Sequence, residues 1–152
     1  MKRATKILIV AVPVVAFLVT AKLMNTSPPS NFAETAPDAE PALRTRLYRA
    51  PFKKVEDAAR SVILSQKTYG RNWTLLFNER ADDTMTVKRL DAEVPVFIFT
   101  DDLTVTLEAM DEGTRVDVIS KSRVENGDFG ENRRHVTQFL SALDVEVGKP
   151  DK

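Results

Sequence analysis

The stretch Ser120–His135 reads SKSRVENGDFGENRRH and decides the fold of this chain. It contains the end of an alternating strand, a turn with Gly127 and Gly130, and the first residues of a helical pattern. Glycine suits such turns because it adopts backbone angles that other residues avoid. Polar side chains are denser here than a simple connection requires, although no reaction can be derived from them. The stretch therefore predicts a strand–turn–helix corner at which candidate functional groups gather.

The strand that enters this corner is predicted to form a hairpin with the segment before it. Residues Leu103–Ala109 alternate apolar and polar side chains, Asp111–Gly113 has the composition of a turn, and Thr114–Val124 returns. If Met110 lies opposite Gly113, apolar residues meet apolar residues and most acids meet bases. The pairs in this register are Leu107 with Val116, Val105 with Val118, Leu103 with Ser120, Glu108 with Arg115, Thr106 with Asp117, and Asp102 with Lys121.

The helix that leaves the corner is predicted to start near Asp128 and to end near Asp144. Asp128 and Glu131 have the spacing of a capping box, in which two side chains bond the free amides of a helix start. The expected inward stripe of this helix is Phe129, Asn132, Val136, Phe139, Leu140 and Leu143. His135 lies beside the stripe and is predicted to be a residue of the helix surface.

The first half of the domain is predicted to contribute one helix and several strands. The helix begins behind Pro51, because proline suits the first helical turn, and Gly70 ends it. The apolar residues of this helix are Phe52, Val55, Ala59, Val62 and Ile63. The expected strands are Leu43–Arg49, Trp73–Phe77, Thr84–Leu90 and Val96–Phe99. Trp73, Phe97 and Phe99 are predicted to lie in the core.

These elements predict an α+β fold in the order β-α-β-β-β-β-α. Hairpin-connected strands indicate a single antiparallel sheet of about five strands, with both helices packed on one face. The predicted domain covers residues 43–147, and residues 148–152 form a frayed tail. The preceding stretch, Asn25–Ala42, holds four prolines and few large apolar residues. It is therefore predicted to be a proline-rich linker that buries too little surface to fold.

The N-terminus is predicted to be a membrane anchor, residues 1–24. Met1–Lys6 is basic, and Ile7–Ala21 has no charged residue over 15 positions. A membrane-spanning helix needs about 20 apolar residues, which Ile7–Met24 approaches if Lys22 extends its ammonium group to the interface. Basic residues before the segment favour a cytoplasmic N-terminus. This predicts a single-pass inner-membrane protein of the bacterial cell envelope, with its domain facing the periplasm.

Two alternatives to the anchor remain open. Val19, Thr20 and Ala21 are small residues suited to signal-peptide cleavage, so the chain could instead be secreted to the periplasm after cleavage near Ala21. A buried core helix is the third interpretation. The chain has no cysteine, which excludes a lipoprotein anchor, disulfides and cysteine-bound metals.

Charge is distributed unevenly along the chain. Four of the 22 basic residues and none of the 22 acidic residues precede Asn25, so the remainder has 18 basic against 22 acidic residues, a net charge of −4. Nucleic-acid binding depends on neutralising phosphates. We therefore expect no nucleic-acid partner, and we expect a membrane contact through the N-terminal segment with an envelope protein or a lipid as a possible partner.

The domain resembles the bacterial and plastid family called "domain of unknown function 1499". The resemblance rests on TDDLTVTLEA at 100–109 and GTRVDVISKSRVENGDFGENRRHVTQFL at 113–140, with the preceding helix and the Trp73 strand. It covers Leu43–Leu143 and implies the fold and the motif positions. Family members often carry an Asn-Cys-Val segment ahead of the domain, which this chain lacks. The family has no established activity, so the resemblance implies no mechanism.

Six polar residues form the candidate binding or structural cluster at the corner: Asp101, Asp102, Ser122, Arg123, Asp128 and Asn132. One interpretation is a polar pocket for an anionic group at a helix start. The other is a brace, in which Arg123 bridges Asp102 and Asp128 while Asn132 bonds the turn backbone. We favour the brace, because ion-pair networks often serve structure alone.

No catalytic residue, metal or cofactor is assigned. His135 is the only histidine, and neighbouring strand residues such as Asp101 and Asp102 point to opposite faces, which disfavours a magnesium site. The favoured function is a non-enzymatic, membrane-tethered domain that binds a partner. The alternatives are a hydrolase-like enzyme that uses Asp102, Arg123 and Asp128, or a domain that binds a small hydrophobic ligand or lipid.

Overall fold

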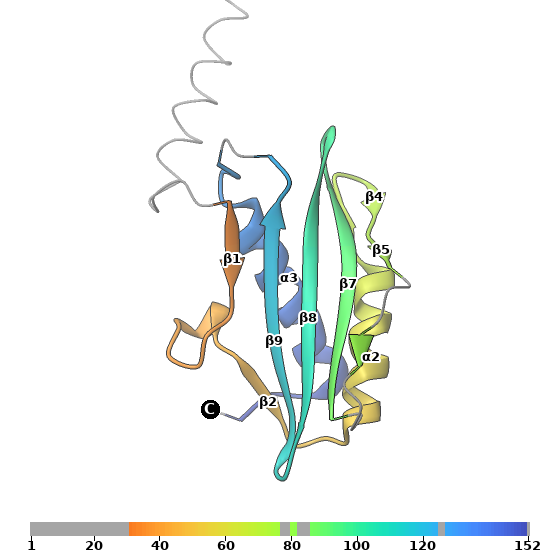
Figure 1. Cartoon of the computed structure of the whole chain (residues 1–152), viewed down its shortest axis with the longest axis vertical. Coiled ribbons are helices and arrows are strands. Elements are labelled where there is room, and N and C mark those ends of the chain that lie inside the picture. The colour runs from red at the N-terminus through yellow and green to blue at the C-terminus, as the bar shows by residue number, and fades with distance from the viewer. Residues whose placement is uncertain (1–30, 77–79, 82–85, 125–126, 152) are drawn as a thin grey trace, which may run out of the picture.

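The β8–β9 hairpin around Gly113 is the centre of the structure (Figure 1). In a computed structural model, residues 31–76, 80–81, 86–124 and 127–151 are described. The elements are β1 (Phe32–Glu34), the 3₁₀ helix η1 (Pro41–Leu43), β2 (Arg46–Tyr48), α2 (Phe52–Ser65), β3 (Lys67–Thr68), β4 (Arg71–Asn72), β5 (Thr74–Leu75), β6 (Arg80–Ala81), β7 (Val87–Val96), β8 (Phe99–Met110), β9 (Gly113–Ser122) and α3 (Glu131–Val147).

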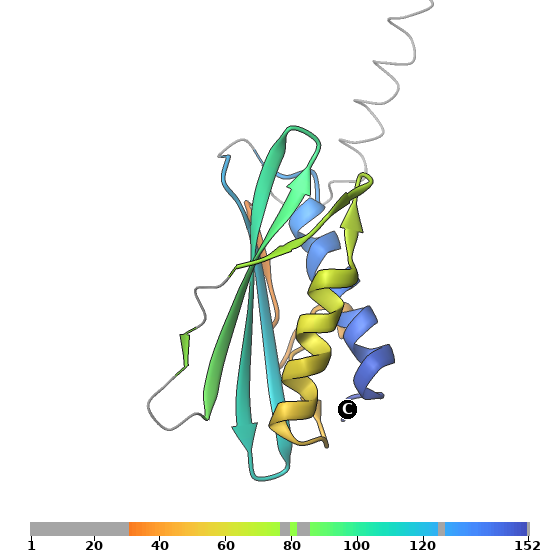
Figure 2. The ribbon, with the colours of Figure 1, turned by 90° about the vertical axis from the view of Figure 1, so that its right-hand side faces the viewer.

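One antiparallel sheet carries the fold, in the order β1-β9-β8-β7-β5, with β2 paired to β9 and β6 paired to β7. Helices α2 and α3 pack against each other and against β8 and β9. Figure 2 shows both helices on the same face of the sheet. The predicted α+β class, with one main antiparallel sheet and two helices, is confirmed. The opposite face of the sheet is open and largely polar.

The predicted hairpin register is confirmed at every position. Met110 pairs with Gly113, and Leu107, Val105 and Leu103 pair with Val116, Val118 and Ser120. Gly113 has a φ of +146°, and a Cβ there would lie 2.0 Å from the carbonyl oxygen of Tyr48. The turn therefore requires glycine both for its backbone angle and for the close approach of β2.

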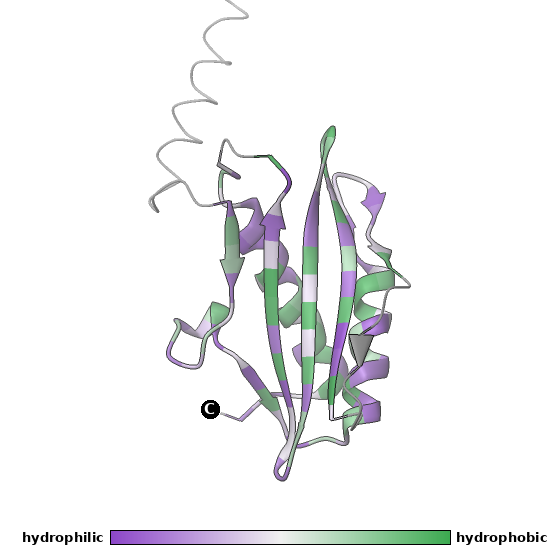
Figure 3. Cartoon of the chain, in the orientation of Figure 1, coloured by the Kyte–Doolittle hydropathy of each residue, from purple (hydrophilic) through white to green (hydrophobic). Residues whose placement is uncertain are grey.

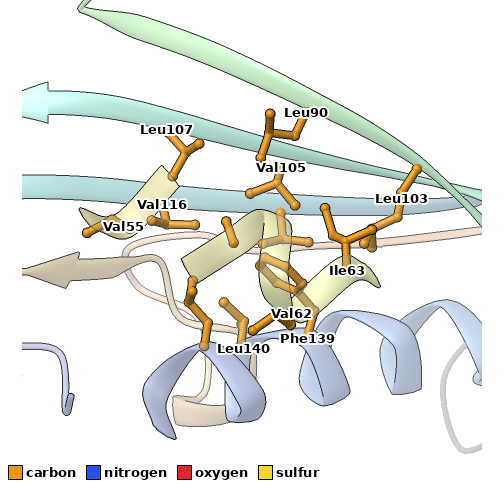
Figure 4. Close-up of a cluster of buried hydrophobic side chains, with 14 of the residues drawn as sticks. Val55, Val62, Ile63, Leu90, Leu103, Val105, Leu107, Val116, Phe139 and Leu140 are labelled. Atoms are coloured by element: carbon orange, nitrogen blue, oxygen red, sulfur yellow. The ribbon is translucent and has the colours of Figure 1, made fainter. Parts of the chain in front are cut away.

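The core lies between the sheet and the helices (Figure 4). The apolar residues predicted for α2 are buried except Phe52, which packs at the margin of the core. The residues of the expected α3 stripe within the helix are also buried, namely Asn132, Val136, Phe139, Leu140 and Leu143. Phe129 is the exception, because it precedes α3 and is 67% exposed. It was expected on the inward stripe, but the helix begins only at Glu131, so the helical spacing does not extend back to it.

The placement of Phe97 and Phe99 in the core was wrong. The segment Val96–Phe99 is not a separate strand: it contains the end of β7, the turn Phe97–Ile98 and the start of β8. Both aromatic rings are exposed. Pro95 ends up near the end of β7, beyond the two residues that pair with β5. Trp73 is buried as predicted.

The folded part begins before Leu43. Residues 32–34 lie in the stretch expected to be a linker, yet they form β1, which pairs with the end of β9. Their backbone bonds with β9 supply the stabilisation that the composition of this stretch did not suggest. At the other terminus the amide of Asp151 donates to the carbonyl of Leu47 at 2.8 Å, so the expected frayed tail is tied to β2.

The hydrophobic segment Ile7–Met24 lies outside the described residues. Over the residues that are described, no helix has both the length and the apolar character needed to cross a bilayer.

Phe139→Ala should strongly destabilise the domain. The Phe139 side chain is fully buried between the sheet and α2, and truncating a buried phenylalanine costs about 3–5 kcal/mol. Urea denaturation should show this loss, while Val145→Ala, which removes an 84% exposed side chain of the same helix, should leave the midpoint almost unchanged. Equal midpoints for the two variants would show that α3 is not seated as described.

Candidate functional site

The six candidate residues do not form one pocket, because they lie on both faces of the sheet. Asp101 pairs with Ser122, and both side chains are buried under α3. Asp102 is the next residue of β8, and Arg123 directly follows the last residue of β9. Both side chains point to the open face, where they bond each other. The sequence register placed these residues side by side correctly, but the alternation of strand side chains separates them into two groups.

On the open face, Arg123 binds two acids from neighbouring strands. Its Nη2 lies 2.5 Å from Asp102 Oδ1 and 2.6 Å from Glu93 Oε1. The hydrogen bond that Arg123 donates to Asp102, followed by the one that it donates to Glu93, raises the pKa of Arg123. We call Arg123, Asp102 and Glu93 the outer trio. Each of them is more than a third exposed, so each ion pair contributes at most about 1 kcal/mol.

Glu93 was missed by the sequence analysis. It lies directly opposite Asp102 on β7, and only the β7–β8 register, which the sequence analysis did not assign, reveals the contact. The expected bridge from Arg123 to Asp128 is therefore replaced by one from Arg123 to Glu93.

Asp128 instead bonds the backbone at the start of α3. Its Oδ1 accepts from the amide of Gly130 at 3.0 Å, and its Oδ2 accepts from the amide of Asn132 at 2.8 Å. The expected capping box is not formed, because the amide of Glu131 donates to the main-chain carbonyl of Asp128 at 3.0 Å and not to its side chain. The carboxylate of Glu131 accepts hydrogen bonds from the hydroxyl of Tyr69, at 2.8 Å, and from Arg134.

Asn132 is fully buried and every polar group of its amide is used. Its Oδ1 accepts from Ser120 Oγ at 2.7 Å, and its Nδ2 donates to Ser122 Oγ at 2.9 Å and to the carbonyl of Asn31 at 3.0 Å. One side chain of α3 thus joins the end of β9 to the residue that precedes β1. The sequence analysis expected Asn132 to bond the backbone of the turn, whereas its partners are Ser120, Ser122 and Asn31.

His135 is completely buried, so its placement on the helix surface was wrong. Its Nδ1 lies 3.4 Å from Ser120 Oγ and 3.6 Å from Asp101 Oδ2, and its Nε2 lies 3.5 Å from Glu131 Oε2. The spacing contained a signal that was not used: His135 follows Asn132 by three residues and precedes Phe139 by four, which is the interval of one helix face.

The inner cluster, which we define as Asp101, Ser120, Ser122, Asn132 and His135, is a buried polar network. Burial raises the pKa of Asp101, and a hydrogen bond from Ser122 only partly opposes it. Asp101 Oδ2 and His135 Nε2 are buried without a hydrogen-bond partner among the described residues. Both the aspartate and the serine approach the same imidazole nitrogen, Nδ1. A Ser-His-Asp triad needs them on different ring nitrogens, so the geometry fits bracing and not nucleophilic catalysis.

Glu131 borders this cluster and has a strongly lowered pKa. Burial by itself would raise the pKa of Glu131, but the nearby imidazole of His135 and hydrogen bonds from Arg134 and Tyr69 outweigh it and lower the pKa to about 2. No group of three metal-ligating side chains gathers in the described part of the chain.

A different surface feature was not predicted from the sequence. Large apolar side chains are exposed together at the end of the sheet where the β7–β8 turn, the β3–β4 turn and the start of α3 meet. We call this surface the apolar end, and its residues are Tyr69, Phe97, Ile98, Phe99 and Phe129. Ile98 at the tip is 87% exposed, and Figure 3 shows the tip of the β7–β8 hairpin in the hydrophobic colour.

Three aromatic residues of the apolar end have backbone angles that side chains disfavour. Tyr69, Phe97 and Phe129 have φ values of +50°, +50° and +51°. A residue other than glycine in this region costs on the order of 1–3 kcal/mol, and glycine or asparagine is the usual occupant. Burial does not offset the cost, because all three side chains are exposed. Burial of these rings therefore does not account for their positions.

Arg123→Ala and Asp128→Asn should be energetically independent. Arg123 acts on the open face and Asp128 on the backbone of α3, so their destabilisations should add within about 0.5 kcal/mol. Arg123→Ala alone should cost less than about 1 kcal/mol. The matched cycle of Arg123→Ala with Asp102→Asn should show coupling. A clear coupling energy between positions 123 and 128 would contradict the division into two faces.

Glu131→Gln should remove part of the acid sensitivity of the domain. Because the pKa of Glu131 falls from 4.5 to about 2 on folding, its carboxylate stabilises the fold above pH 4.5, and this contribution is lost as the pH falls from 4.5 towards 2. Thermal melts across this window should show a shallower loss of stability in Glu131→Gln than in the wild type. Glu146→Gln reports the effect of removing an exposed carboxylate from the same helix. Parallel curves for wild type and Glu131→Gln would contradict the assignment.

Comparison with known proteins supports the family but not an activity. No match is found among curated proteins. One solved structure that resembles the chain is the crystal structure of protein CV1439 from Chromobacterium violaceum, with 12% identity and a TM-score of 0.44, covering 80% of this chain and all of that one. A family model described as "Protein of unknown function (DUF1499)" matches residues 22–143. The match covers most of the sequence, including β1, and the chain therefore belongs to the DUF1499 family.

Proposed function

We propose that the chain is a membrane-anchored domain on the periplasmic side of the inner membrane, which acts by binding and not by catalysis. The observation that carries the proposal is the apolar end. Soluble surfaces rarely expose contiguous apolar patches without a binding role. Here the exposed apolar side chains come from three separate turns.

The polar corner supports the same proposal. Both oxygens of Asp128 accept backbone hydrogen bonds, the amide of Asn132 is fully bonded, and Arg123 is neutralised by Asp102 and Glu93. The hydrolase-like alternative needs Asp102, Arg123 and Asp128 to converge on a substrate. Instead, two of them face the open side of the sheet and the third is engaged at the start of α3.

The anchor is supported by the sequence. The uncharged segment Ile7–Ala21 follows the basic residues Lys2, Arg3 and Lys6, an order that keeps the N-terminus in the cytoplasm and carries the domain across. Only residues 25–30 separate Met24 from the first described residue, Asn31.

Reporter fusions test the location directly. A reporter that is active only in the periplasm, fused after Lys152, should be active in cells, and a reporter that is active only in the cytoplasm should be silent. The fusion should stay in the membrane fraction after alkaline washing. The reverse reporter pattern would overturn the proposal, and a soluble mature form that begins near Lys22 would replace the anchor by a cleaved signal peptide.

A further inference from the structure

We propose that the apolar end docks onto the lipid surface of the membrane that anchors the chain, with the tip of the β7–β8 hairpin at the level of the lipid headgroups. This inference rests on the proposed anchoring and names the partner of the apolar end. It follows from the rigidity of that end, from where the chain enters the domain, and from the chemistry of the exposed side chains.

The apolar end is a rigid surface because its turns support one another. The ring of Tyr69 stacks on that of Phe97 with a centroid distance of 3.9 Å, and Arg71 Nη1 donates to the carbonyl of Phe97 at 2.9 Å. Tyr69 is also bonded through its hydroxyl to Glu131 at the start of α3. The β3–β4 turn, the β7–β8 turn and α3 are thereby joined, so the exposed rings are held in place before any partner binds.

The entry point of the chain orients this end towards the membrane. The carbonyl of Asn31 accepts from the amide of Ser122 at 2.8 Å, and Ser122 pairs with Asp101. Asn31 is therefore level with Asp101, three residues from Ile98, or about 10 Å below the tip at the rise of a β-strand. Figure 1 shows the start of β1 and the β7–β8 turn at the same end of the domain.

The tether is short compared with these distances. Residues 25–30 span at most about 20 Å when fully extended. A domain held at Asn31 by such a tether stays close to the bilayer, and the apolar end is the part nearest to it. The opposite end of the sheet, at the β8–β9 turn, lies about 40 Å further away, because β8 has 12 residues at about 3.3 Å each.

The side chains of the apolar end match the interfacial region of a bilayer. Phenylalanine and isoleucine enter the boundary between headgroups and acyl chains to a depth of about 5–10 Å, and tyrosine favours the same zone. Exposed basic side chains, Lys67, Arg71 and Lys121, lie on the strands beside these turns. Such residues favour contact with anionic lipids. An isolated hairpin of this size would bind weakly, but the anchor keeps it at high local concentration next to the lipid.

A single environment-sensitive dye tests the docking. The full chain has no cysteine, so Ile98→Cys gives one label at the tip and Met110→Cys gives one at the opposite end of β8. Each labelled chain is reconstituted into vesicles of phosphatidylcholine and phosphatidylglycerol, with and without a lipid that carries a quencher near its headgroup. We expect a blue-shifted emission and loss of most of the fluorescence with quencher lipid at position 98, and neither effect at position 110.

The controls separate this inference from the proposed anchoring. Flotation of the vesicles with the labelled chain tests the anchor alone, and a chain that fails to float overturns the anchoring. If the chain floats but the dye at position 98 reports water, as at position 110, the docking alone is overturned. A signal that depends on protein density instead of on the lipid would assign the surface to a second copy of the chain, which also contradicts the inference.

A second variant tests whether the emission at position 98 depends on the neighbouring apolar side chain. In the Ile98→Cys background, Phe97→Ser should return the emission towards that of water, provided that its thermal melt matches that of the parent. An unchanged blue shift in this variant would show that the ring of Phe97 does not take part in docking, and would contradict the surface as defined.

Discussion

The buried amide of Asn132 is the interaction on which the arrangement of this domain depends. It bonds Ser120 and Ser122 of β9 and the carbonyl of Asn31, so that the sheet, the last helix and the incoming chain meet at one residue. An unpaired buried amide would be costly, so a side chain with all its hydrogen bonds made permits a single arrangement of these three parts. The position of Asn31 in turn determines at which end of the sheet the chain enters the domain.

The polar corner and the apolar end therefore have different roles. The corner uses its charges internally: Arg123 with two acids on the open face, Asp128 with the backbone of α3, and Glu131 with Tyr69, Arg134 and His135. The apolar end, in contrast, exposes aromatic rings at backbone positions that are costly for them. The residues that looked chemically richest in the sequence hold the fold together, whereas Phe97 and Phe99, which were expected in the core, form part of the exposed surface.

How much the sequence could predict depended on whether a pattern was local. The β8–β9 register followed from side-chain alternation and one turn, and it was correct because a shift by one residue would expose every core side chain. The two helices followed from their apolar spacing. The contacts of Arg123 did not, because the Phe97–Ile98 turn that sets Glu93 opposite Asp102 contains none of the residues that mark a turn in a sequence. Phe97 and Phe99 were placed in the core from their hydrophobicity alone, and nothing local indicated that their turn projects beyond the helices. His135 could have been placed from its interval to Asn132 and Phe139.

Hydrogen exchange with and without a lipid bilayer tests most directly whether the apolar end is the proposed contact surface. The backbone amides of the turns at Tyr69–Gly70 and Phe97–Ile98 should exchange more slowly when the full chain is in a lipid bilayer disc than when the domain of residues 31–152 is free in solution. The turn at Asp111–Glu112, at the far end of the sheet, should exchange at the same rate in both. Equal exchange at the first two turns, or slower exchange at Asp111–Glu112, would contradict the account.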